Sequence, residues 1–244
     1  MGMPITVEIV DAIATSTDID NVFDYFTYVD MKFSTYKPES EISRINRGEI
    51  AAADYSADMR EVFALSEETK RATNGYFDIR TAAGPIDPSG LVKGWAIYNA
   101  AKILEREGFQ NFYVEAGGDI QVRGTTAQGQ TWRVGLRSPF EHEKIVKVVA
   151  LTNAGIATSG TYLRGQHIYD PHCPDAPLTD VVSLSVIGPN VYEADRFATA
   201  AFAMGRQGIA YIEHLHGFEG YQIDHAGIAT MTSGFEKYVI NSTT

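Results

Sequence analysis

Asp195 and Thr199 carry oxygen-bearing side chains at a spacing that places them on one face of a helix. They lie within a predicted helix over residues 193–204, where Phe197, Ala201 and Met204 can face a core, and positions four apart have Cβ atoms about 5–6 Å apart. A carboxylate and a hydroxyl form part of a Mg²⁺ site, which water, carbonyl or phosphate oxygens complete. The alternative is an acidic residue favoured by the helix dipole beside an ordinary helical threonine, and spacing alone favours that alternative.

Two glycine-containing segments have the composition of ligand-binding turns. Residues 116–119, Ala-Gly-Gly-Asp, follow a predicted strand. Paired glycines let the backbone approach a ligand closely, and Asp119 can form a hydrogen bond with a ribose hydroxyl. A tight hairpin turn is the alternative, because strand-like residues follow at once. Residues 90–94, Gly-Leu-Val-Lys-Gly, offer free amides and the Lys93 cation at a predicted helix start. Neither segment has the spacing of a dinucleotide fingerprint or a P-loop.

A third segment combines hydroxyl side chains, glycine and a histidine. Residues 155–161, Gly-Ile-Ala-Thr-Ser-Gly-Thr, are interpreted as a turn whose amides can bind phosphate or adenine. His167 is suited to proton transfer near neutral pH, and Asp170 can orient it. The alternative is a turn followed by a histidine that only packs. Tyr36, on a predicted polar loop, can stack on a flat ring, although such tyrosines more often cover core.

The composition excludes several classes of protein. The 244 residues include 20 basic and 31 acidic ones, for a net charge of −11, which argues against a general nucleic-acid binder. The lone Cys173 excludes an internal disulfide and cysteine-based zinc sites. No apolar run approaches the roughly 18 residues of a membrane span. The first residues resemble no signal peptide, so we expect a cytoplasmic protein; the alternative is a periplasmic one whose targeting segment was removed.

Hydrophobic periodicity predicts an α+β fold with helices packed on mixed or antiparallel sheets. We expect a single domain over residues 1–244, built as one unit or as two packed lobes. The predicted helices cover residues 19–33, 40–46, 56–72, 89–108, 193–204 and 207–216. The predicted strands cover residues 5–9, 112–114, 131–136, 146–151 and 181–188, with two more near the end of the chain.

Six motifs occur in one order along most of the chain. They are FSTYKPESEISRIN (33–46), DPSGLVKG (87–94), EAGGD (115–119), ATSG (157–160), HIYDP (167–171) and ADRFATA (194–200). Together with the opening Met-Gly-Met, this ordered set resembles the ApbE family of flavin transferases. The set is far more specific than any one motif. With it, a metal site becomes the favoured interpretation of Asp195 and Thr199.

The resemblance implies a T-fold-like α+β domain that binds FAD and Mg²⁺. It implies transfer of FMN from FAD to a threonine or serine hydroxyl of an acceptor flavoprotein, with release of AMP. By motif position, Asp195, Thr199 and a backbone oxygen at Gly90 are the expected metal ligands, and His167 is the expected catalytic residue. The residues expected to contact FAD are Tyr36, which would stack on the isoalloxazine, and Lys93, Glu115, Gly117, Gly118, Asp119, Ser159 and Gly160.

Two other functions remain open from the sequence. In a metal-dependent FAD pyrophosphatase, water would replace the protein hydroxyl and release FMN and AMP. A non-catalytic FAD-binding protein would keep the fold without turnover. Asp195, Thr199 and His167 count against the second of these, because a binder needs no base beside the pyrophosphate. The expected partners are FAD and an acceptor flavoprotein, without nucleic acid or a membrane span.

Overall fold

A seven-stranded antiparallel sheet forms the centre of the molecule in the computed structural model, which describes residues 2–81, 83–141, 143–160 and 168–240. In spatial order its strands are β1 (Ile5–Ile9), β2 (Phe112–Ala116), β3 (Asp119–Arg123), β6 (Ala154–Gly160), β7 (Val181–Gly188), β8 (Glu219–Asp224) and β9 (Ala229–Met231). Every neighbouring pair is antiparallel. The turn of residues 116–119 is the hairpin that joins β2 to β3.

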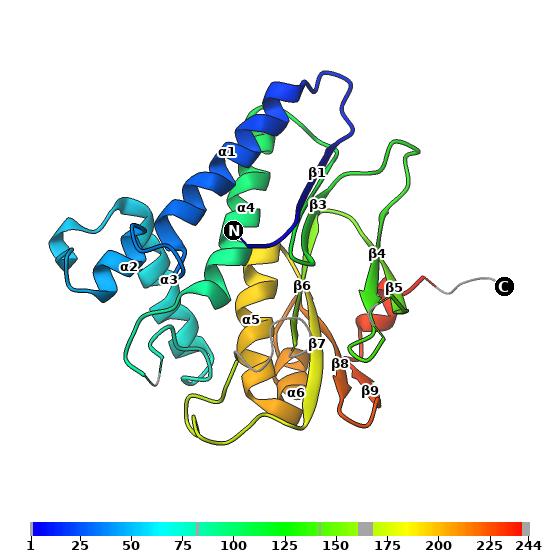
Figure 1. Ribbon diagram of the computed structural model, residues 1–244. Helices are drawn as coiled ribbons and strands as arrows, with labels where there is room; N and C mark the ends of the chain where they lie inside the picture. Colours follow the sequence, from blue (N-terminus) through cyan, green and yellow to red (C-terminus); the bar gives the residue numbers. More distant parts are fainter. Residues whose placement is uncertain (1, 82, 142, 161–167, 241–244) are drawn as a thin grey trace.

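Helices cover one face of this sheet, as Figure 1 shows. The long helices are α1 (Ser16–Phe33), α3 (Ala57–Ala72), α4 (Ser89–Arg106) and α5 (Val191–Ala203), and the short ones are α2 (Glu41–Asn46) and α6 (Gly208–Glu213), with single 3₁₀ turns at Ala52–Asp54 and Gly205–Gln207. Ser40 and Ser56 begin α2 and α3, because each side chain accepts a hydrogen bond from the backbone N–H three residues on. None of the described helices is long and apolar enough to cross a membrane.

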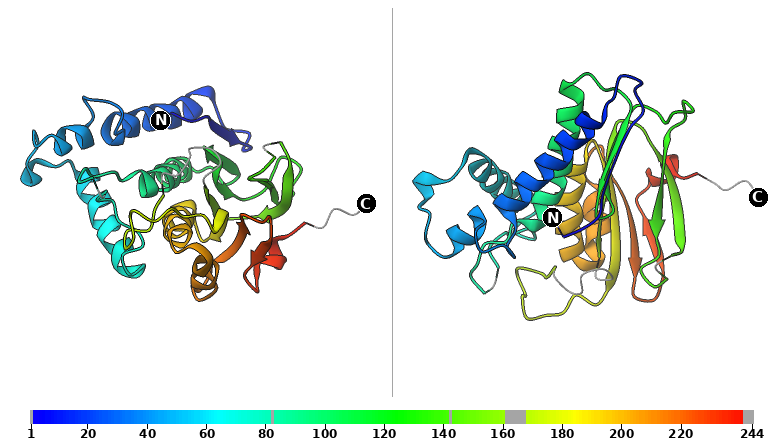
Figure 2. Two further views of the ribbon diagram at one scale, coloured as in Figure 1. Left: turned by 60° about the horizontal axis from the view of Figure 1, so that its bottom comes forward. Right: turned by 45° about the horizontal axis from the view of Figure 1, so that its top comes forward.

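A second, two-stranded sheet covers the opposite face (Figures 1 and 2). It consists of β4 (Trp132–Arg137) and β5 (Ile145–Leu151). A 3₁₀ turn near the C-terminus, η3 (Phe235–Tyr238), leads to Val239, which forms a bridge with Val149 of β5. Its alternating buried residues Trp132, Val134 and Leu136 pack with Ile120 and Ile156 of the main sheet. The alternation of buried and exposed side chains along β4 is what the period of two residues in a strand dictates.

The predicted α+β class is confirmed, and both sheets are antiparallel throughout the described residues. The interpretation of residues 155–161 as a turn is wrong, because residues 154–160 form the buried central strand β6. Gly155 serves packing there: a Cβ at this position would collide with the backbone of Val191 at the start of α5. The extent of the domain, residues 1–244, stays a prediction.

Candidate active site

A cavity of about 1070 Å³ opens where the first turn of α4, the middle of α5 and the β2–β3 hairpin meet. Its volume is at the upper limit of about 300–1,000 Å³ for small-molecule sites. Nine of the twelve predicted site residues line it: Gly90, Lys93, Glu115, Gly117, Gly118, Ser159, Gly160, Asp195 and Thr199. A tenth, Asp119, is buried immediately beside them, bound to Lys93 and to the backbone of Thr158. The cavity therefore gathers residues that lie more than 100 positions apart in the chain.

Two glycines on one face of α4 allow α5 to come close to the cavity. A Cβ on Gly94 would lie 2.6 Å from Cβ of Asp195 and 2.8 Å from the carbonyl oxygen of Val191. A Cβ on Gly90 would lie 3.1 Å from Cγ2 of Thr199. Only glycine permits this approach at position 94, since these distances are shorter than contacts that Cβ atoms make. Gly94 is not among the predicted site residues; its signal in the sequence is the spacing of four residues from Gly90, which puts both on one helix face.

The close approach brings a carbonyl oxygen of α4 to the two side chains that the i,i+4 pattern places on one face of α5. Asp195 is 2 % exposed, and its Oδ2 accepts a hydrogen bond from the N–H of Gly94 at 2.8 Å. The hydroxyl of Thr199 donates to the carbonyl oxygen of Gly90 at 3.2 Å. A carboxylate, a hydroxyl and a carbonyl thus face the same corner of the cavity, and all three are hard oxygen donors.

Lys93 lies between two buried carboxylates. Its Nζ is 2.5 Å from Oδ2 of Asp119 and 3.5 Å from Oδ1 of Asp195. Burial raises the pKa of Asp195; the Lys93 ammonium opposes this shift, and the Asp119 carboxylate adds to it. When both carboxylates are ionised, one lysine facing them leaves a net negative charge at this corner. Such a charge favours a bound cation.

The β2–β3 hairpin has the left-handed backbone that its paired glycines predict. Gly117 and Gly118 have φ values of 60° and 94°, which residues with a Cβ adopt only with strain. The carboxylate of Glu115 accepts a hydrogen bond from the N–H of Gly118 at 2.8 Å and so fixes the turn. Oδ1 of Asp119 accepts one from the N–H of Thr158, which ties the hairpin to β6 beside Ser159.

Two predicted residues are not brought into this cavity by the described structure. Tyr36 lies on the loop between α1 and α2 with 95 % of its surface exposed, and it does not line the cavity. Its stacking on a flavin ring stays a prediction. His167 lies outside the described residues. Asp170, expected to orient it, accepts a hydrogen bond from the N–H of His172 and lies 3.0 Å from its Nδ1.

The donor atoms fit a hard divalent cation with few protein ligands. Among the described residues no three His, Cys, Asp or Glu side chains cluster as a metal site. A cation at this corner would therefore have few carboxylate ligands, and Asp195 is the predicted one. Thr199 and the Gly90 carbonyl would add two neutral oxygens. Mg²⁺ is commonly held in this way, by one or two carboxylates together with water and substrate phosphate oxygens.

Comparisons with known proteins show what the chain as a whole is similar to. A "FAD:protein FMN transferase" of Salmonella typhimurium is 32% identical over 151 residues, covering 58% of this chain and 43% of its own length. The protein of that name from Haemophilus influenzae is 24% identical over 275 residues, covering 86% of this chain and 80% of its own. The chain thus matches less than half the length of the Salmonella relative.

Solved structures share the fold. The "Flavin Transferase ApbE from Vibrio cholerae" superposes with a TM-score of 0.84 at 22% identity, covering 98% of this chain and 96% of the other. The apo "Pseudomonas stutzeri flavinyl transferase ApbE" gives a TM-score of 0.83 at 21% identity, over 98% and 95% of the two chains. The ApbE family profile matches residues 1–85 and 80–222. The chain therefore belongs to the ApbE family.

Proposed function

We propose that this protein transfers FMN from FAD to a threonine or serine hydroxyl of an acceptor flavoprotein, releases AMP, and depends on Mg²⁺. One observation carries the proposal: a buried carboxylate, a hydroxyl and a carbonyl converge beside a lysine ammonium at the wall of a cavity large enough for a dinucleotide. The names of the curated relatives support the same reaction.

FAD would bind with its pyrophosphate at the first turn of α4. The positive end of the α4 dipole and the Lys93 ammonium would attract phosphate oxygens. The β2–β3 hairpin, with its two glycines in left-handed conformations, would let the backbone approach the adenosine end closely. Asp195, Thr199 and the Gly90 carbonyl would hold Mg²⁺, which supplies neutralisation of charge on the pyrophosphate oxygens.

The transfer itself exchanges one phosphorus–oxygen bond for another. The acceptor hydroxyl oxygen attacks the phosphorus of the FMN half, the bond from this phosphorus to the bridging oxygen breaks, and AMP leaves with that oxygen. A threonine hydroxyl is a weak nucleophile at neutral pH, so a base must remove its proton. His167 is our proposal for this base. A positioned base contributes about 10²- to 10⁴-fold to the rate.

The test is incubation of the purified protein with FAD, Mg²⁺ and a candidate acceptor, followed by measurement of the intact acceptor mass. We expect a mass increase equal to FMN less one water, which is FAD minus AMP, with one AMP released per modified acceptor. An acceptor with alanine in place of its threonine is the matched control and should stay unmodified. If free FMN accumulates at one rate with or without acceptor, and several acceptors stay unmodified, the protein is an FAD pyrophosphatase and the proposal is wrong.

A further inference from the structure

The two edges of the small β4–β5 sheet differ. Beyond β5, the chain returns at Val239 and pairs with Val149, and the N–H of Ile240 donates to the carbonyl oxygen of Val148 at 2.9 Å. Beyond β4, none of the described residues pairs with the strand. Unpaired edge strands are templates for another strand, and proteins usually cover them or interrupt them. The open edge of β4 therefore calls for an explanation.

The register shows which backbone groups the open edge presents. Because the Val148 carbonyl binds Ile240, the polar groups of Val148 point away from β4. Val148 lies opposite Gly135, and in an antiparallel pair of this kind both residues direct their N–H and C=O groups outward. The alternation along a strand then makes Arg133 and Gly135 residues whose N–H and C=O groups face the open edge. The register shifts between Leu136 and Arg137, but the N–H of Ser138 donates inward to the carbonyl oxygen of Lys144, so the polar groups of Arg137 also face the open edge.

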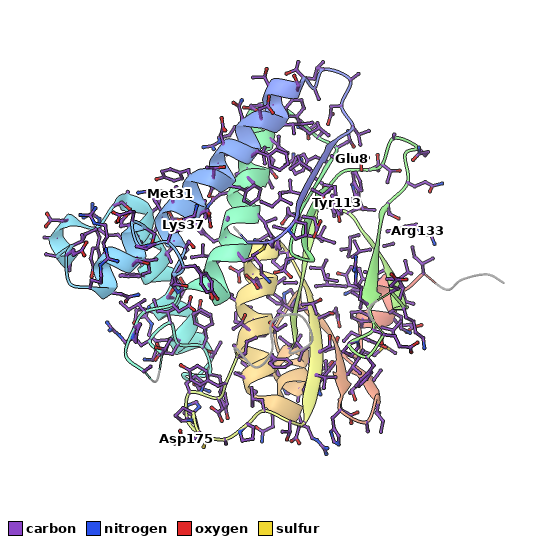
Figure 3. All side chains as sticks on the ribbon, in the orientation of Figure 1. Glu8, Met31, Lys37, Tyr113, Arg133 and Asp175 are labelled. Carbon is purple, nitrogen blue, oxygen red and sulfur yellow. The ribbon has the colours of Figure 1, made fainter. Side chains whose placement is uncertain are left out.

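This edge is part of the cavity wall. All five residues from 133 to 137 line the same cavity as Gly90, Lys93 and Asp195. The β4 strand starts near the far end of β2, where the Trp132 ring packs on Tyr113 with its centroid 5.6 Å away. Arg137, at the other end of β4, lines the cavity together with Gly117 and Gly118 of the β2–β3 hairpin. Figure 3 shows Tyr113 and Glu8 lying between the main sheet and the strand that carries Arg133.

The open edge carries positive charge in a protein whose net charge is −11. Arg133 and Arg137 are exposed on one face of β4, and neither forms an ion pair with any acidic residue in the described part of the chain. Gly135 between them has no side chain. The opposing surface carries Glu8 and Glu115, which lie near Tyr113. Burial raises the pKa of Tyr113 to about 12, and the charges of these two glutamates add to the shift. The positive charge of Arg133 and Arg137 along the open edge of β4 thus favours an acidic partner that binds beside these two residues and away from the glutamates.

We propose that the open edge of β4 binds an extended, acidic segment of the acceptor protein as an additional antiparallel or parallel strand, which leads its hydroxyl toward the Asp195–Thr199 corner. This inference rests on the proposed function, which requires a protein hydroxyl to enter the cavity. Strand addition supplies affinity through backbone hydrogen bonds, and pockets or charges for alternate side chains supply specificity. Residues of the segment opposite Arg133 and Arg137 would be four apart on one face, and those between them would point into the cavity.

Peptide binding tests the inference without turnover. The probe is a fluorescein-labelled decapeptide with one threonine and two aspartates four residues apart, titrated with the full chain in FAD and EDTA and followed by anisotropy. A peptide with lysines in place of the aspartates is the matched probe. We expect the acidic peptide to bind about tenfold more tightly, because both charges change sign at the two arginines. Equal affinity of the two peptides would overturn the inference.

Backbone pairing is tested at Gly135. Both Gly135→Ala and Gly135→Pro add a Cβ near the movable end of Ile145, but only proline removes the outward N–H. We expect Gly135→Pro to bind the acidic peptide threefold or more weakly than Gly135→Ala, because one hydrogen bond is lost. Equal binding by the two variants, with circular dichroism showing both folded, would contradict strand addition.

Charge reversal supplies the last arm. Arg133→Glu with Arg137→Glu should weaken acidic-peptide binding about tenfold. Arg106→Glu, an exposed change at the other end of α4 and about 24 Å along the helix from Gly90, is the control. If Gly135→Pro instead raises the KM for FAD, or turns a wild-type dimer into monomers in light scattering, the edge binds FAD or a second copy and the inference is wrong. If wild type binds the peptide through this edge but never labels any acceptor, the proposed function alone fails.

Discussion

Replacement of Gly94 by alanine should destabilise the protein although alanine is the better helix former. In a helix interior this exchange is worth about 1 kcal/mol in favour of alanine. Here the new methyl carbon would lie 2.6 Å from Cβ of Asp195 and 2.8 Å from the Val191 carbonyl oxygen. Neither atom can rotate away, because both are fixed by the backbone of α5. Overpacking costs about 1–3 kcal/mol, and contact with atoms fixed by the backbone puts this case at about 2–3 kcal/mol. After the helix-forming gain is subtracted, we expect a net loss of about 1–2 kcal/mol.

The loss is measurable in thermal unfolding. For a chain of this length 1 kcal/mol corresponds to about 2–4 °C in Tm, so the Tm of Gly94→Ala should fall by about 2–8 °C. Gly90→Ala is the comparator, because its Cβ would meet only side-chain atoms of Thr199 and Phe77, at 3.1 and 3.4 Å. Those side chains can shift by a few tenths of an ångström, and we expect the Tm of this variant to stay near that of wild type.

The same substitution should weaken Mg²⁺ binding, because separation of the helices moves Asp195 away from the Gly90 carbonyl. A ligand at 100 times its Kd stabilises the native state by about 2.7 kcal/mol, and this gain should shrink in Gly94→Ala. The assay is a Mg²⁺ titration of the Tm for both variants. If Gly94→Ala is as stable as Gly90→Ala and keeps the full Mg²⁺-dependent rise, close helix packing does not build the site.

Four further outcomes follow from the site. Asp195→Asn should remove both the Mg²⁺-dependent rise in Tm and FMN transfer, and excess EDTA should do the same to wild type; transfer rates and Tm measure this. Lys93→Met leaves two buried carboxylates without their cation and should cost about 3–5 kcal/mol in urea unfolding. Tyr36→Ala should weaken FAD binding in a flavin fluorescence titration; unchanged affinity would refute the stacking prediction. His167→Ala should slow FMN transfer about 10²- to 10⁴-fold while FAD stays bound, as acceptor mass measurement would show.

The helices and most strands could be predicted from the sequence because each depends on local patterns. Apolar residues recur at helical spacing along α1, and Ser40 and Ser56 stand where capping serines are expected. The same patterns placed Asp195 and Thr199 on one face of α5. Periodicity does not show which residues of an apolar stripe are buried, since Phe23 fits the stripe of α1 and is 40 % exposed.

The central strand β6 was misread because its residues are small and polar. Glycine, alanine, serine and threonine around Gly155 and Ser159 have the composition of a turn. They are small since α5 starts directly against this strand, which leaves no space for a Cβ on Gly155. Contact between residues far apart in the chain thus overrides the local preference. A single sequence shows that residue 155 is a glycine, but it does not show which backbone segment packs against it.

The same limit applies to the chemistry of the site. The pair Asp195–Thr199 is visible from spacing, but the Gly90 carbonyl and Lys93 reach it from a helix about 100 residues earlier. Their convergence depends on Gly94, whose importance appears only when α5 packs on it. In β4, likewise, alternation predicts the strand and the face of Arg133 and Arg137, whereas the pairing of its neighbour with the C-terminal segment decides which edge stays open. Local pattern therefore specifies the reactive groups, and long-range packing specifies which of them can act together.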